Sequence, residues 1–310
     1  MLVMEKMEAL PDPENFTINI ITLNYLLFDE KNISVKMLRL DQVHPIISGN
    51  KLFKLNYFLK EAINSDHKQV VTFGGPYSNH LAATAFACKI AGLKSVGVVR
   101  GERPKTISQT LDFCISNGMH LEFISRSSYK QIRNDTFTNS LSKKIGFHTL
   151  IPEGGFSNMG MRGAGLICKY FNSENFSHIC CPVGTATTFG GIINGSTDAG
   201  LSIGFGVLKN LSDIKERLNE LQVDSSKKYI FNGDYHFGGY AKKNKELLDF
   251  MNNFYAQNKI PLDFVYTAKM MFGIYDLAQK NYFPPGANVL CIHTGGLQGN
   301  NSLPAGLLNF

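Results

Sequence analysis

The sequence of 310 residues contains no tryptophan, and only 18% of its residues are charged. Its six cysteines include no Cys-x-x-Cys pair, and its histidines and cysteines lack the spacing of metal ligands. The longest apolar stretch, residues 18–28, is interrupted by Asn19 and Asn24 and is too short to span a bilayer. These absences argue against a disulfide framework, a metal centre and a membrane protein.

The net charge of +6 is spread along the chain, and no basic run is longer than a pair such as Lys227-Lys228. A nucleic-acid-binding protein usually concentrates such charge, so we expect no nucleic-acid partner, although a small anionic substrate is compatible with this charge. The N-terminus shows no charged-then-apolar leader and instead carries the acidic residues Glu5, Glu8, Asp12 and Glu14. We therefore expect a cytoplasmic protein with reduced, mostly buried thiols.

Short apolar runs and helical periodicity alternate along most of the chain. Two early strands are expected at residues 18–28 and 34–39, paired across a turn. Later strands are expected at residues 69–73, 95–99, 120–124, 148–151, 178–181, 203–208, 228–231 and 288–292. Helices are expected at residues 51–62, 78–91, 106–117, up to about 144, 161–170, 188–199, 211–221, 244–257 and 269–280. This alternation predicts an α/β protein with parallel sheets and helices on both faces.

A segment rich in glycine, serine and asparagine, residues 152–160, separates two series of strands and helices. We expect a larger domain of residues 1–50 and 160–310 and a smaller domain of residues 51–159. The active site is expected in the cleft between them.

Lys51 follows Gly49 and Asn50 at the point where a loop enters a predicted helix. An aldehyde cofactor requires a lysine with a lowered pKa, because only the neutral amine forms a Schiff base. Taken alone, a lysine at a helix start is usually solvated. We interpret Lys54, three residues later, as such a solvated neighbour.

The segment 184–191 follows a predicted strand and opens a predicted helix. Its amide groups and the hydroxyls of Thr185, Thr187 and Thr188 suit a phosphate monoester. It is not a dinucleotide fingerprint, since Ala186 occupies the position of the second glycine, and no Gly-Lys-Ser/Thr follows as in a Walker loop. An ordinary strand-to-helix turn remains the alternative.

Two further segments have the chemistry of a binding site. Ser78, Asn79 and His80 open a predicted helix after Gly74-Gly75, and Thr294 lies just past the last strand. Strand ends of this kind collect ligands in open α/β sheets. The alternatives are a helix N-cap for the first segment and a tight turn for the second. A nucleophile elbow is excluded, because Ser78 is not flanked by glycines at the required spacing.

Together these segments resemble the fold-type-II family of pyridoxal-phosphate enzymes that includes 1-aminocyclopropane-1-carboxylate deaminase and D-cysteine desulfhydrase. The likeness covers residues 40–300. Gly49-Asn-Lys-Leu-Phe-Lys-Leu is similar to the family's cofactor-lysine motif, and Asp263-Phe-Val-Tyr-Thr-Ala-Lys-Met is similar to its late tyrosine motif. The resemblance implies a two-domain, tryptophan-synthase-β-like fold and a homodimer.

The resemblance also implies roles for individual residues. Lys51 would bind pyridoxal 5'-phosphate covalently, Asn79 would contact its ring hydroxyl, and Thr294 would lie beside the pyridine nitrogen. The phosphate would be held by Gly184, Thr185, Ala186, Thr187 and Thr188. Lys51, Ser78 and Tyr266 would be catalytic, and the substrate would contact Ser78, Asn79, His80 and Tyr266.

Two positions bear on the reaction. Tyr266-Thr267 and Thr294-Gly295-Gly296 resemble the desulfhydrases, where ring-opening deaminases carry Tyr-Glu and Leu-Gly-Gly. A hydroxyl at the pyridine nitrogen gives a weaker electron sink than a carboxylate and suits prompt loss of a β-leaving group. The expected reaction is α,β-elimination from a small β-substituted amino acid such as D-cysteine, giving pyruvate, ammonia and sulfide. The alternatives are a ring-opening deaminase or another reaction on the same scaffold, and a non-catalytic protein that binds pyridoxal phosphate or another phosphate.

Overall fold

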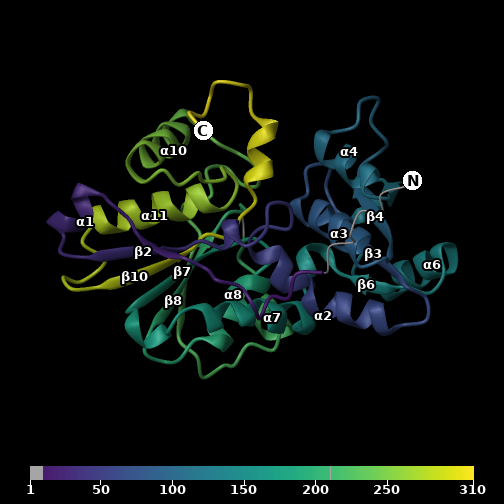
Figure 1. Ribbon diagram of the computed structural model, residues 1–310, viewed down its shortest axis with the longest axis horizontal. Coiled ribbons are helices and arrows are strands. Elements are labelled where there is room, and N and C mark those ends of the chain that lie inside the picture. The colour runs from purple at the N-terminus through teal and green to yellow at the C-terminus, as the bar shows by residue number, and fades with distance from the viewer. Residues whose placement is uncertain (1–9, 210) are drawn as a thin grey trace, which may run out of the picture.

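The computed structural model describes residues 10–209 and 211–310, so Glu5 and Glu8 of the acidic N-terminal segment lie outside the described residues. It contains a six-stranded sheet in the order β1-β2-β10-β7-β8-β9 and a four-stranded sheet in the order β5-β4-β3-β6. All neighbouring strands are parallel except β1 and β2, which are antiparallel. The α/β fold class with parallel sheets is therefore confirmed. Figure 1 shows the two sheets in opposite halves of an elongated molecule.

The six-stranded sheet is built from both ends of the chain. Its strands are β1 Ile20–Thr22, β2 Ser34–Leu38, β7 His178–Val183, β8 Leu201–Gly206, β9 Tyr229–Asn232 and β10 Asn288–Ile292. The helices of this half are α1 Leu26–Glu30, α8 Thr187–Gly195, α9 Ile214–Glu220, α10 Lys245–Asn258 and α11 Thr267–Gln279. Cys180 of β7 packs with residues of α10 and α11, and Cys181 packs with residues of α8. The two cysteines thus point to opposite faces of one strand.

The four-stranded sheet comes from the middle of the chain. Its strands are β3 Gln69–Gly74, β4 Lys94–Arg100, β5 Met119–Ile124 and β6 Thr149–Ile151. The helices of this half are α2 Asn50–Asn64, α3 Asn79–Ile90, α4 Gln109–Ser116, α5 Arg126–Tyr129 and α6 Asp135–Ile145, and α7 Asn158–Gly165 follows at the junction with the other half, where Met161 packs with residues of α8. Single 3-10 turns or short 3-10 helices connect these elements: η1 Leu40–Gln42, η2 Glu153–Gly155, η3 Leu166–Tyr170, η4 Ser173–Asn175 and η5 Leu297–Ser302.

Helices α2 and α7 lie between the two halves in Figure 1. Their backbones approach closely, since a Cβ added at Gly163 of α7 would lie 2.3 Å from the carbonyl oxygen of Phe53 in α2. Each sheet draws its strands from the segments that the sequence assigns to one domain. The boundaries themselves stay a prediction. No helix in the described part of the chain is long and apolar enough to cross a bilayer.

The predicted early strand, residues 18–28, is wrong in its second half, where Leu26–Glu30 forms helix α1. The cause is tertiary packing. The ring of Tyr25 lies 5.4 Å from that of Phe28 and 5.2 Å from that of Tyr275. Burying these rings against α11 favours a helical turn over an apolar pattern that suits a strand equally well.

The single helix predicted to run to about residue 144 is also wrong, because two helices occupy this region. Helix α5 ends at Tyr129, and Asn134 caps the following helix by accepting a hydrogen bond from Thr136 N at 2.8 Å. An asparagine side chain that bonds the backbone in this way starts a new helix. The helix predicted at residues 161–170 is α7 Asn158–Gly165 continued by the 3-10 helix η3.

Helix α2 begins where its backbone touches the end of β10. Gly49 has φ +70°, and a Cβ added there would lie 1.9 Å from the carbonyl oxygen of Thr294. Asn50 N donates to the same oxygen at 3.2 Å, and Gly49 N donates to Leu40 O at 2.8 Å. Only glycine combines this conformation with this distance.

We predict that Gly49→Ala lowers the free energy of unfolding by about 3 kcal/mol or more, the sum of left-handed strain and overpacking. Gly92→Ala is the matched control, because Gly92 also has a positive φ of +65° but nothing lies within 4 Å of its added Cβ. This control should lose only about 1 kcal/mol. Urea unfolding measures both variants, and equal losses would contradict the contact between Gly49 and Thr294.

Candidate active site

The carboxyl ends of strands from both sheets open onto a cavity of about 490 Å³. Segments that follow β3, β5, β6, β7, β8 and β10 contribute to its walls, together with Arg100 at the end of β4, as expected for a ligand site of parallel sheets. All residues that the sequence singled out for the site line this cavity: Lys51, Ser78, Asn79, His80, Gly184, Thr185, Ala186, Thr187, Thr188, Tyr266 and Thr294.

Lys51 lies in the first turn of α2 and points its amine into this cavity. Its Nζ donates to Asn50 Oδ1 at 2.7 Å and lies 5.7 Å from the centre of the Tyr266 ring. Burial lowers the pKa of Lys51 to about 8, although Asp263 acts in the opposite direction. A sizeable fraction of this amine is therefore neutral near pH 8, which is the nucleophilic form.

Lys54 is not the solvated neighbour that the sequence suggested. It is only 4% exposed, lines the same cavity, and donates from Nζ to Gly154 O at 2.6 Å. Burial, together with the charge of Lys51, lowers the pKa of Lys54 well below its usual value. Residues three apart share a helix face, so a helix that points Lys51 inward also points Lys54 inward. This spacing was the sequence signal from which the burial of Lys54 could have been predicted.

The Gly184 loop runs from β7 into the N-terminus of α8. Ala186 adopts a left-handed conformation with φ 74°, and the hydroxyl oxygens of Thr185 and Thr187 lie 3.0 Å apart. Asn50 Nδ2 donates to Thr188 Oγ1 at 2.7 Å, which connects this loop to the residue before Lys51. Hydroxyls gathered at a helix N-terminus suit a phosphate.

Lys54 also approaches this loop through its hydrogen-bond partner. A Cβ added at Gly154 would lie 2.9 Å from Thr185 Cγ2, so the carbonyl that binds the Lys54 amine belongs to a residue in contact with the loop. Gly184 leaves little room for a side chain, because a Cβ there would lie 3.2 Å from the Tyr266 ring. The Gly184 loop, Lys54 and Tyr266 therefore border the same part of the cavity.

Ser78, Asn79 and His80 open helix α3. Ser78 Oγ caps the helix by accepting from Leu81 N at 3.3 Å, and Asn79 Nδ2 donates to Gly296 O at 3.2 Å. The ring of His80 is buried, with Nε2 3.0 Å from Thr72 Oγ1. Burial lowers the pKa of His80 well below its usual value, and the charges of Lys54 and Lys51 add to this effect. His80 is therefore neutral and packed at physiological pH.

Tyr266 precedes helix α11, and its backbone N donates to Asp263 Oδ2 at 2.7 Å. Burial raises the pKa of Tyr266 well above its usual value, and Tyr240 raises it further. The Tyr240 ring packs edge-on against the Tyr266 ring with 6.3 Å between their centres, and it too lines the cavity. Sequence reasoning missed Tyr240, whose main signal was its place directly after Gly238-Gly239.

Thr267, which follows Tyr266 in the late tyrosine motif, does not line the cavity. It is fully buried, and its N and Oγ1 both donate to Asp263 Oδ1, at 3.0 Å and 2.9 Å. Asp263 Oδ2 accepts from Val265 N and Tyr266 N. The carboxylate is thus occupied by the start of α11, and burial raises its pKa. Of Thr267 and Thr294, the two threonines in the motifs that resemble the desulfhydrases, only Thr294 lines the cavity.

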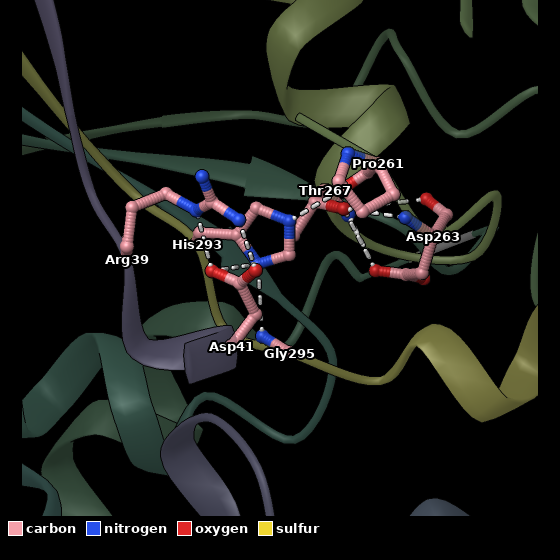
Figure 2. Close-up of polar contacts among 7 residues, drawn as sticks. All are labelled: Arg39, Asp41, Pro261, Asp263, Thr267, His293 and Gly295. Carbon is pink, nitrogen blue, oxygen red and sulfur yellow. Dashed lines mark hydrogen bonds and ion pairs between the residues drawn. The ribbon is translucent and has the colours of Figure 1, made fainter. Parts of the chain in front are cut away.

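A buried polar network of Arg39, Asp41 and His293 lies next to Thr294. Figure 2 shows the His293 ring between Asp41 and Pro261, with Nε2 2.8 Å from Pro261 O and Nδ1 3.2 Å from Gly295 N. Arg39 donates to both oxygens of Asp41, at 2.8 Å and 2.6 Å. Burial alone would raise the pKa of Asp41, but the Arg39 guanidinium holds it below its usual value. The network fixes the backbone on both sides of Thr294.

Positive charge dominates the cavity. The cationic residues that line it are Lys51, Lys54, Arg100, Lys130, Arg133 and Arg217. Glu153 is the one acidic side chain among the described lining residues, and it accepts a hydrogen bond from Tyr129 at 2.8 Å. A cavity with this lining attracts anions such as a phosphate or an amino-acid carboxylate.

Comparisons with known proteins agree with this chemistry. A family model described as "Pyridoxal-phosphate dependent enzyme" matches residues 27–295. A Thermotoga maritima protein named "Putative 1-aminocyclopropane-1-carboxylate deaminase" is 32% identical, over 86% of this chain and 89% of that protein. An Arabidopsis thaliana protein named "Bifunctional D-cysteine desulfhydrase/1-aminocyclopropane-1-carboxylate deaminase, mitochondrial" is 29% identical, over 82% of this chain and 70% of that protein.

A solved structure described as an ACC deaminase homologue matches with a TM-score of 0.77 and 25% identity, over 93% of this chain and 92% of that chain. The matched family segment includes the four-stranded sheet, every strand of the six-stranded sheet except β1, and every cavity residue named above except Gly296. A buried amine of lowered pKa beside a threonine-rich helix N-terminus also fits an aldehyde that carries a phosphate. The chain therefore belongs to the family of pyridoxal-phosphate-dependent enzymes, among relatives of the 1-aminocyclopropane-1-carboxylate deaminase and D-cysteine desulfhydrase type.

Proposed function

We propose that this enzyme catalyses α,β-elimination from a small β-substituted amino acid, with D-cysteine as the model substrate. With one water consumed, the products are pyruvate, ammonia and sulfide. The observation that carries the proposal is the buried amine of Lys51, which lies in a cationic cavity beside Tyr266 and has a pKa lowered to about 8.

The cofactor would be held by residues from four segments. Lys51 is the proposed covalent attachment point, and residues 184–188 with the Lys54 ammonium are the proposed phosphate site. Asn79 would contact the ring hydroxyl, and Thr294 would lie beside the ring nitrogen. When bound, pyridoxal phosphate supplies the electron sink for negative charge that develops at the substrate Cα.

The protein's own groups supply the remaining chemistry. Lys51, once neutral, is the proposed general base for the Cα proton, because its lowered pKa keeps part of the amine unprotonated near neutral pH. Ser78 and Asn79 lie at the N-terminus of α3, whose dipole favours a substrate carboxylate. Tyr266 keeps its proton because burial raises its pKa, so its hydroxyl can donate a hydrogen bond to a departing thiolate.

Thr294 favours elimination over ring opening. The side chain that lines the cavity just past β10 is a hydroxyl, and the buried carboxylate of Asp263 is occupied by hydrogen bonds at the start of α11. A weak partner for the ring nitrogen suits prompt loss of a leaving group. Ring-opening deamination is the second candidate, because relatives of this chain carry that activity in their names.

One prediction of this function concerns the substrate. The purified protein, loaded with pyridoxal phosphate, should release sulfide and pyruvate from D-cysteine and little 2-oxobutyrate from 1-aminocyclopropane-1-carboxylate. Lys51→Ala should abolish the release. If neither cysteine isomer released sulfide and 2-oxobutyrate formed from 1-aminocyclopropane-1-carboxylate, the enzyme would be a ring-opening deaminase and the proposed elimination would be wrong.

A second prediction concerns Lys54. Lys54→Met should weaken binding of pyridoxal phosphate by about tenfold or more, since a charge-assisted contact to the phosphate is lost. Binding of pyridoxal, which has no phosphate, should change little. Lys60→Met is the matched control, because Lys60 is exposed on the same helix. Fluorescence titration of the apoprotein measures both, and equal weakening for the two ligands would argue against Lys54 as a phosphate ligand.

The same variant has a pH-dependent effect on stability. A lysine whose pKa is lowered in the folded protein carries fewer protons there than in the unfolded chain, so its stability penalty shrinks as pH rises toward its ordinary pKa. We predict that apo Lys54→Met melts above the wild type at pH 7 and that this difference narrows by pH 10. Thermal unfolding at both pH values checks this, and a gap that widens with pH would contradict burial of the charged amine.

A further inference from the structure

Lys269 is a fully buried lysine that the proposed chemistry does not use. It lies in the first turn of α11 and is 0% exposed. Its Nζ donates to the carbonyl oxygens of Gly239 at 2.7 Å, His236 at 2.8 Å and Val207 at 3.5 Å. A lysine ammonium has three donors, and here they meet backbone carbonyls rather than a carboxylate. Burial lowers the pKa of Lys269 to about 8, although Asp263 acts in the opposite direction.

Two of these carbonyls, those of His236 and Gly239, belong to a strained connection between β9 and α10. Four residues there have positive φ: Phe237 52°, Gly238 91°, Gly239 116° and Ala241 54°. For phenylalanine and alanine this conformation is unfavourable, so other contacts must hold it. Lys269 binds the carbonyls of His236 and Gly239, which also accept backbone hydrogen bonds from Gly239 N and Lys242 N. The ammonium therefore fixes the turn at its start and near its end.

Tyr240 lies inside this strained turn, directly after Gly239. Its ring packs edge-on against Tyr266 and lines the cavity. The backbone of Tyr266 is fixed separately, since its N donates to Asp263 at 2.7 Å. Asp263 and Lys269 are buried and flank Tyr266 in sequence. Asp263 binds the backbone of Tyr266, and Lys269 binds the backbone of the turn that contains Tyr240.

We propose that Lys269 is a positioning residue for the active site, whose ammonium binds the carbonyls of His236 and Gly239 and so holds Tyr240 against Tyr266. The geometric part stands on the hydrogen bonds alone. The kinetic part rests on the proposed function, because it requires that Tyr240 and Tyr266 face the reacting substrate.

Hydrogen exchange tests the geometric part without any substrate. In the full-length holoenzyme, Lys269→Met should speed exchange of the Gly239 and Lys242 amides by about tenfold or more, because the carbonyls that accept from them lose their cation. Residues 94–100 of β4 should be unchanged. Lys280→Met is the matched control, since Lys280 lies at the exposed end of the same helix. Lys269→Gln keeps a neutral amide that can donate two hydrogen bonds, and it serves if the methionine variant does not fold.

A double-mutant cycle with Tyr240→Ala, which removes the ring that packs against Tyr266, tests the kinetic part. If Lys269 acts through Tyr240, Lys269→Met should lower kcat by about 10- to 100-fold when Tyr240 is present. In the Tyr240→Ala background, the same change should lower kcat by less than about twofold. A purely structural lysine would lower kcat by the same factor in both backgrounds.

Two results would overturn the inference: unchanged exchange at residues 236–242, or equal kinetic losses in the two backgrounds. A wild type that is inactive on both D-cysteine and 1-aminocyclopropane-1-carboxylate would overturn the proposed function instead. In that case the exchange result alone decides whether Lys269 holds the turn.

Discussion

The contact between Gly49 and the Thr294 carbonyl is the constraint on which the rest of the site depends. It joins the start of α2 to the end of β10, so Asn50 and Lys51 enter the cavity from a backbone that a larger residue would displace. Asn50 then reaches Thr188 at 2.7 Å, which ties the Gly184 loop to the same point. The network of Arg39, Asp41 and His293 holds the other partner of this contact in place (Figure 2).

Burial of amines without carboxylate partners is the second theme of the structure. Lys51, Lys54 and Lys269 all have lowered pKa values, and burial is the largest cause for each. Burying a charge costs free energy unless hydrogen bonds compensate, so each amine either finds polar oxygens or becomes neutral. Lys54 and Lys269 donate to backbone carbonyls, whereas Lys51 donates to the side chain of its neighbour Asn50. That difference leaves Lys51 the least constrained of the three and suits it to covalent chemistry.

Much of the fold could be predicted because strands and helices here follow simple periodicity. The expected strand at residues 288–292 coincides with β10, and the strand at 69–73 differs from β3 by one residue. Helix α1 could not be predicted, since its apolar residues fit either structure until Tyr25 and Phe28 meet α11. The burial of Lys54 could have been predicted from its spacing to Lys51 on the helix. The usual preference of lysine for solvent led to the opposite prediction. The place of Tyr240 in the cavity wall depends on the strained turn that contains it, and the burial of Thr267 depends on its hydrogen bonds to Asp263. No local sequence pattern reveals either feature.

Lys51, and not the more deeply buried Lys54, is the proposed attachment point of the cofactor. Reduction of the holoenzyme with borohydride fixes pyridoxal phosphate to the lysine that binds it, and peptide mass spectrometry then identifies that residue. Our account predicts a single pyridoxyl group on Lys51 and none on Lys54. A label on Lys54, or none on either lysine, would contradict it.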